Sequence, residues 1–132
     1  MPAVGETAPA ILGAPGGRSF VFGARRLVEA IDTDGAIWLV SGTVEPEAEV
    51  TLNAAGGLSL TVRADAAGAW QAQVPAEPSL VVRSGARSAT VSPRFAESPD
   101  VGTIAYLESP QGVSFAWRLP DGAVQRTWTP AG

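Results

Sequence analysis

The side chains best suited to contacting a ligand gather near the C-terminal end of the chain. Phe115, Trp117, Arg126 and Trp128 lie on either side of an Asp-Gly pair at 121–122, which is typical of a two-residue β-hairpin turn. Such a turn would pair Trp117 with Arg126 and Phe115 with Trp128 on one face. Because an arginine stacks favourably on an aromatic ring, the four would form one strip able to dock a glycan or a protein.

The same four side chains have a second interpretation. They could close the core of a β-sandwich, with Arg126 lying over an aromatic ring at the rim. The strip depends on the register of the hairpin, because a three-residue turn would change the pairs. It is therefore a hypothesis for a partner-binding face, beside the alternative of a core element.

The acidic residues supply oxygen atoms but not the spacing of a metal site. The segment Asp32-Thr33-Asp34-Gly35 looks like a fragment of a calcium loop, yet the further oxygen ligands and the closing bidentate acid are missing. We interpret it as a turn. Two other acidic groups could form a loose cation site, but a solvated edge that discourages aggregation is the simpler interpretation. One group is Glu45, Glu47 and Glu49, which we expect on the same side of an extended strand, and the other is Glu97 with Asp100.

Composition excludes several kinds of chemistry. The chain has no Cys and no His, which removes Ser-His-Asp and Cys-His nucleophiles and the commonest zinc ligands. Two carboxylates can hydrolyse a glycosidic bond, but the acids here lie mostly in turns or on polar faces. We expect a protein that is not an enzyme and that has no catalytic residue, metal or cofactor.

The charge and the ends of the chain bear on partners and location. A net charge of −4 with nine Arg and no Lys disfavours binding to nucleic acid or anionic lipid. The first residues lack the features of a secretory signal, and no run is long enough to cross a membrane, so we expect no direct membrane insertion. The bacterial periplasm, the cell surface or a virion is favoured as the location.

The spacing of turns predicts an all-β chain. With 15 Gly and 11 Pro in 132 residues, long helices are disfavoured, and we expect about ten strands. Residues 1–17 should form an extended arm and 18–132 a single domain, with a core at about 25–93 and a C-terminal three-stranded meander at about 103–129. Residues 93–102 should form a long loop or a boundary. The expected strands cover 19–22, 25–31, 36–41, 49–54, 58–64, 70–74, 79–83, 87–91, 103–107, 113–119 and 123–129.

The stretch 42–74 carries the clearest pattern. Val50 and Leu52 alternate with polar residues, and after a Gly-Gly turn a second strand repeats the pattern. Asp65 should accept backbone hydrogen bonds in a turn where Gly68 takes a positive φ, which would aim Trp70 inward. Gly42 should permit the bend that ends a strand. Trp38, in a strand apolar on both faces, is a further core residue.

This pattern resembles two families of β-sandwich. Gly42-x-x-x-Pro46-x-Ala48-x-Val50-x-Leu52 followed by Asp65-x-x-Gly68-x-Trp70 is similar to bacterial Ig-like domains and to transthyretin-like domains related to the carboxypeptidase regulatory module. The resemblance covers about residues 36–92, with Glu47 in place of a Gly often found before the Ala. It implies a Greek-key sandwich of about seven strands, here extended by the meander.

The resulting functional hypothesis is a non-catalytic structural or binding module of a bacterial envelope or surface assembly. It would dock a protein or glycan partner through loops, a sheet edge or the aromatic hairpin face. The main alternative is a phage or phage-like virion component, a decoration or tail protein, whose copies self-assemble through the arm and a sheet edge. A carbohydrate-binding module is the third.

Overall fold

A computed structural model describes residues 10–13, 19–22 and 26–131 of the chain, the first two ranges as backbone only. The remaining residues of the expected N-terminal arm lie outside the described part. The described residues form strands and connecting segments and include no helix long and apolar enough to cross a membrane. The strands are β1 (Ala10–Gly13), β2 (Ser19–Phe22), β3 (Ala30–Thr33), β4 (Ile37–Thr43), β5 (Glu49–Ala54), β6 (Ser59–Arg63), β7 (Ala69–Pro75), β8 (Leu80–Ser84), β9 (Arg87–Val91), β10 (Ile104–Ser109), β11 (Gly112–Arg118) and β12 (Val124–Pro130).

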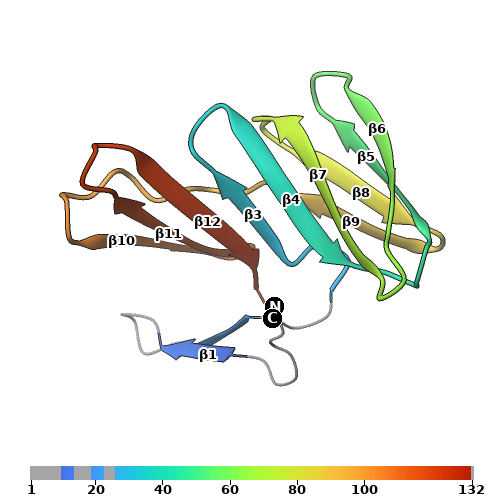
Figure 1. The fold of residues 1–132 in the computed structure, drawn as a ribbon, viewed down its shortest axis with the longest axis horizontal. Coiled ribbons are helices and arrows are strands. Elements are labelled where there is room, and N and C mark those ends of the chain that lie inside the picture. Colours follow the sequence, from blue (N-terminus) through green and yellow to red (C-terminus); the bar gives the residue numbers. More distant parts are fainter. Residues whose placement is uncertain (1–9, 14–18, 23–25, 132) are drawn as a thin grey trace.

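Two antiparallel sheets pack as a sandwich, so the all-β prediction is confirmed. One sheet has six strands in the order β10-β11-β12-β3-β4-β7, and the other has four in the order β6-β5-β8-β9. The expected meander β10-β11-β12 joins the larger sheet through pairing of β12 with β3. Figure 1 shows that this meander extends beyond the part of the molecule where the four-stranded sheet lies.

The core lies between the two sheets, where alternation along each strand turns the apolar side chains inward. One row crosses four strands of the larger sheet in register, with Trp128 beside Ile31, Ile31 beside Val40 and Val40 beside Ala72. All four are buried. They belong to one hydrophobic cluster with buried residues of β5, β8 and β9, so strands of the core and of the meander share it. Its members from the smaller sheet are Val50, Leu52, Ala54, Leu80, Val82 and Val91.

Trp70 is fixed by a hydrogen bond that crosses a glycine. Its indole N–H donates to the carbonyl of Leu27 at 3.0 Å, and both residues are buried. The bond passes over Gly42, the cross-strand partner of Trp70, where a Cβ would lie 1.9 Å from the Leu27 oxygen. Gly42 therefore lies inside β4 and allows close approach of another backbone. The prediction that it bends the chain at a strand end is wrong.

The turn before β7 has the predicted construction. The Asp65 Oδ1 atom accepts hydrogen bonds from the backbone N–H groups of Ala67 and Ala69, each at 2.9 Å. Gly68 has a φ of 87°, and Trp70 is 4 % exposed. The predicted roles of these three turn and strand residues are confirmed.

Residues 26–29 differ from the strand expected at 25–31. Leu27 and Val28 are adjacent and both buried, which breaks the two-residue alternation of a strand. Backbone hydrogen bonds still hold this segment along β4: Thr43 N–H donates to the Arg26 carbonyl, and Glu29 N–H donates to the Ser41 carbonyl. The strand proper begins only at Ala30. A bend that presents the Leu27 carbonyl to Trp70 thus replaces the first part of the expected strand.

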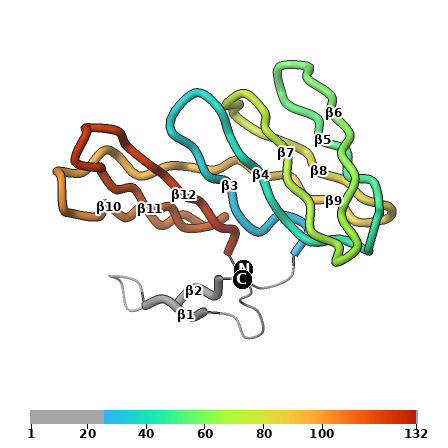
Figure 2. The backbone as a smooth tube through the Cα atoms, viewed as in Figure 1, coloured from blue at the N-terminus to red at the C-terminus, as the bar shows by residue number. Residues whose placement is uncertain are grey.

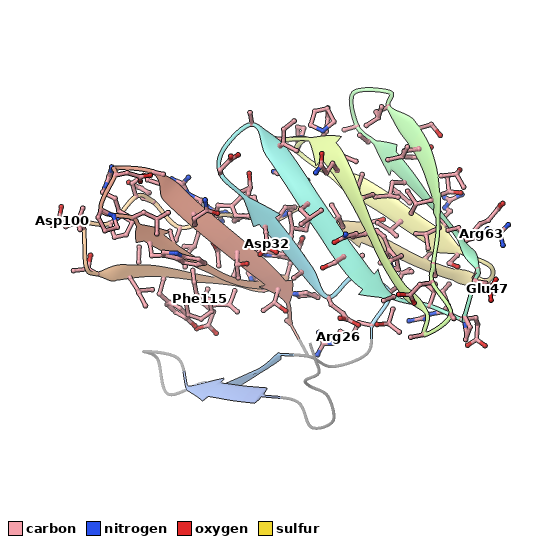
Figure 3. The ribbon with its side chains drawn as sticks, viewed as in Figure 1. Arg26, Asp32, Glu47, Arg63, Asp100 and Phe115 are labelled. Carbon is pink, nitrogen blue, oxygen red and sulfur yellow. The ribbon has the colours of Figure 1, made fainter. Side chains whose placement is uncertain are left out.

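Glu47 occupies a left-handed backbone conformation, with a φ of 59°. It lies in the connection from β4 to β5, so the three glutamates at 45, 47 and 49 are not on one extended strand, and that expectation is wrong. Arg63 donates to the Glu47 carbonyl at 3.1 Å, and Figure 3 shows the two residues at the same end of the sandwich. A side chain at such a φ is strained, whereas glycine is not.

Replacing Glu47 with glycine should therefore stabilise the fold. We expect Glu47→Gly to raise the free energy of unfolding by about 0.5–1 kcal/mol, because relief of the left-handed strain exceeds the added backbone entropy of the unfolded chain. Urea denaturation monitored by tryptophan fluorescence measures this change. Glu47→Ala is the matched control, since it removes the charge but keeps the strain. Equal stability of the two variants would contradict the prediction.

Candidate functional site

The C-terminal hairpin has a different register from the predicted one. Phe115 lies opposite Thr127 and Trp117 opposite Gln125, whereas Trp128 lies opposite Ser114. The predicted pairs of Trp117 with Arg126 and Phe115 with Trp128 are wrong. Since a slip of one residue turns side chains to the other face of a sheet, the expected strip is divided between two faces.

The connection between β11 and β12 explains the slip. The last cross-strand pair is Arg118 with Val124, so the turn is longer than the Asp-Gly pair alone. Leu119 N–H donates to Ala123 O, and the Asp121 carboxylate accepts from the Ala123 N–H at 2.9 Å. Gly122 takes a φ of 93°. The Asp-Gly pair does form the turn, but within a wider loop that shifts the register by one.

The inner half of the expected strip is structural. Trp128 is 1 % exposed in the hydrophobic core, as the alternative interpretation expected. Arg126 donates from Nε to the carbonyl of Ala96 at 2.7 Å and from its terminal nitrogen to Ser98 Oγ at 3.0 Å. It holds a chain segment and does not stack in an exposed strip. The inner face of the meander is thus occupied by the protein itself.

That chain segment is residues 93–102, here named the covering segment. Ala96 N–H donates to Ser114 Oγ at 2.9 Å, and Arg118 Nε donates to the Pro99 carbonyl at 2.9 Å. Phe95 packs on Trp38, with ring centroids 5.9 Å apart. Figure 2 shows the chain running from β9 across to β10 at the far edge of the larger sheet. The covering segment, which the sequence identified only as a loop or boundary, closes the inner face of the meander where the second sheet is absent.

The outer half of the expected strip lies on the face of the six-stranded sheet that is turned away from the four-stranded sheet, here named the outer face. Phe115 and Trp117 are both half-buried there, and Tyr106 packs on Phe115 with ring centroids 5.4 Å apart. Ile104, opposite Trp117, is 70 % exposed. The most exposed large apolar side chain in the strands of the meander therefore lies beside Trp117.

A shallow groove continues the outer face beyond Trp117. It has a volume of about 380 Å³ and is lined from β3, β4, β7 and β12. Asp32, Leu39 and Gln73 form one cross-strand row, which continues through Thr127 to Phe115. Gln125, opposite Trp117, lies two residues before Thr127 on β12. This outer groove combines amide and carboxylate groups with an apolar floor. Sequence reasoning did not identify it, because its members come from four separate strands.

Asp32 is the polar centre of the groove. Thr127, its cross-strand neighbour, donates a hydrogen bond to the Asp32 carboxylate, and Figure 3 shows Asp32 near the middle of the larger sheet. Desolvation by partial burial raises the pKa of the Asp32 carboxyl above its ordinary value of 3.8. Asp32 and Thr33 belong to β3, so the expected turn begins two residues later than predicted. The described residues contain no cluster of three or more His, Cys, Asp or Glu side chains that could hold a metal ion.

Comparisons of the chain with protein-family models, with curated proteins and with solved structures found no match.

The covering segment should depend on Arg126. Arg126→Ala removes two hydrogen bonds to residues 96 and 98, and we expect a loss of about 2 kcal/mol in unfolding free energy. Hydrogen exchange at the Ala96 amide should accelerate more than exchange in β5. Arg83→Ala, at an exposed position on β8, is the matched control and should change neither quantity. Unchanged protection of Ala96 in Arg126→Ala would refute this role.

The raised pKa of Asp32 makes a prediction about pH. A carboxyl whose pKa is higher in the folded than in the unfolded state contributes stability that is fully present below the unfolded pKa of about 3.8, and this contribution is lost as the pH rises through the folded pKa. Unfolding free energies of Asp32→Asn and of the natural chain should therefore be measured from pH 3 to 7. We expect the value for Asp32→Asn minus the value for the natural chain to increase as the pH rises. Asp34→Asn controls for the change in net charge. Parallel profiles for Asp32→Asn and the natural chain would contradict the assignment.

Proposed function

We propose that this chain is a non-catalytic binding module that docks a glycan through the outer face of the six-stranded sheet. The proposal places it in a bacterial envelope or surface assembly, in accordance with the Ig-like and transthyretin-like resemblance over residues 36–92. The chain between β4 and β8 passes repeatedly from one sheet to the other, which is compatible with a Greek-key sandwich.

The observation that carries the proposal is a staggered row of ligand-type side chains across adjacent strands, in which the pair of Trp117 and Gln125 is offset by two residues from Asp32 and Gln73. Trp117 lies beside Gln125, and the outer groove then presents Asp32 and Gln73. Strands are spaced about 4.8 Å apart, so the four spacings from β11 to β7 cover about 19 Å. This length suits an extended oligosaccharide better than a single small molecule.

The chemistry of the row fits a neutral sugar chain. An aromatic ring stacks on the apolar face of a sugar, while amides and carboxylates exchange hydrogen bonds with its hydroxyl groups. A net charge of −4 opposes an acidic polymer. A rigid sheet also holds these groups in place, so little side-chain ordering is needed on binding.

Titration with neutral oligosaccharides tests the proposal. We expect α- or β-linked glucan, chitin or mannan oligomers to change the tryptophan fluorescence, and Trp117→Ala to weaken binding about tenfold, which corresponds to about 1.4 kcal/mol. Leu58→Ala, at an exposed apolar residue beside the four-stranded sheet, is the control and should bind normally.

Two results would overturn the proposal. One is the absence of any response across the glycan panel. The other is unchanged affinity in a correctly folded Trp117→Ala variant. A third outcome would assign the outer face to a protein partner. In that outcome no glycan changes the fluorescence, and a protein binds the natural chain specifically but does not bind Trp117→Ala.

A further inference from the structure

The exposed edges of the two sheets differ in their protection. Charged residues on an edge strand discourage pairing with another chain, and three of the four edge strands carry one: Arg63 on β6, Arg87 on β9 and Glu108 on β10. The fourth, β7, has the sequence Ala-Trp-Gln-Ala-Gln-Val-Pro and carries no charge. It is also seven residues long, against five or six for the others. β7 is therefore the edge best suited to accept another strand.

The hydrogen bonds of β4 show which backbone groups of β7 face outward. Thr43 and Ser41 bond to residues 26 and 29, on the side of β4 away from β7. Antiparallel pairing alternates, so the even-numbered residues of β4 bond to their partners Trp70, Ala72 and Val74. The bond from Ala76 N–H to Ala36 continues this alternation.

The odd-numbered residues of β7 consequently direct their backbone groups to the open edge. Ala69 uses its groups in the turn with Asp65. Among the described residues, none bonds to the outward N–H and C=O groups of Gln71 and Gln73, and both side chains are exposed. Pro75 ends the edge, because it has no N–H to donate. The open part of the edge is thus short and centred on Ala72.

We propose that β7 of a second copy of this chain pairs antiparallel with this edge, with Ala72 opposite Ala72 and Gln71 opposite Gln73 of the second copy. In this register Gln71 and Gln73 each exchange both backbone hydrogen bonds with the residue opposite. Their side-chain amides, which combine donor and acceptor, also lie opposite one another on the outer face. The edge is therefore complementary to itself under a two-fold axis.

The symmetric sequence Gln71-Ala72-Gln73 favours a second copy over an unrelated strand, and the absence of charge permits the contact. Each chain has a net charge of −4, yet no residue of β7 adds repulsion at the contact. The axis is perpendicular to the sheet, so the outer faces of both copies point the same way in one continuous sheet. The pairing needs no glycan and is tested without one, so a failure of this proposal is distinguishable from a failure of the proposed function.

Sedimentation velocity over a range of protein concentrations, from about 10 μM to about 1 mM, tests the pairing. We expect a reversible monomer–dimer equilibrium. Gln71→Lys combined with Gln73→Lys places lysines opposite one another and should weaken association at least about tenfold. Gln71→Lys combined with Gln73→Glu places opposite charges together at both positions and should restore association at low salt.

The two double variants distinguish this register from others. In a pairing of Gln71 with Gln71, the Lys/Glu variant would bring like charges together and would also dissociate. Both positions are exposed, so urea denaturation should show folded proteins of similar stability. A monomer at every concentration, a dimer that the two lysines leave unchanged, or no rescue by the Lys/Glu variant would each overturn the proposal.

Discussion

The hydrogen bond from the Trp70 indole to the Leu27 carbonyl is the contact on which the arrangement of the larger sheet depends. It joins β7 to the segment before β3 across β4, and it satisfies a buried donor and a buried acceptor together. Only a glycine at position 42 leaves room for it. The bond holds the bend at Leu27 and Val28, after which β3 starts at Ala30, and it fixes the inward-facing Trp70 in place. The geometry of β3 in turn sets where β12 can pair.

Pairing of β12 with β3 creates a problem that the covering segment resolves. The larger sheet has six strands and the smaller has four, so the meander extends past its opposing layer. An uncovered inner face would leave apolar side chains in water, at a cost of about 25 cal/mol for each Å². Residues 93–102 lie across that face instead, and Phe95 continues the core beside Trp38. Arg118 and Arg126 hold the segment by donating to the carbonyl groups of Pro99 and Ala96, which no regular structure would satisfy there.

Local patterns predicted the elements, and the failures occurred where distant parts of the chain decide the outcome. The strands at 49–54 and 87–91 have the expected bounds, because alternation and flanking turns define them locally. The register of β11 and β12 depends on one extra turn residue, which no periodicity shows. The candidate site followed that register: Phe115 and Trp117 lie half-buried on the outer face, whereas Trp128 is in the core and Arg126 bonds to the covering segment on the inner face. The outer groove could not be found, because Asp32, Gln73 and Gln125 become neighbours only through the sheet order. The left-handed Glu47 was signalled by its departure from the patterns that the chain resembles, which often have glycine there, although its backbone angle was not inferred.

The contact between β3 and β12 also has a consequence for the order of folding. The bonded pair Asp32 and Thr127 is separated by 95 residues in the chain, and most of the sandwich lies between them. During synthesis β3, β4 and β7 can meet β5, β6, β8 and β9 well before β12 leaves the ribosome, and domains generally fold from the N-terminal side first. Until then β3 is itself an open edge, and Ile31 lacks its neighbour Trp128. The last strand of the meander therefore closes a nascent chain that is already largely assembled, and a chain stopped before β12 would present the edge of β3 to its neighbours.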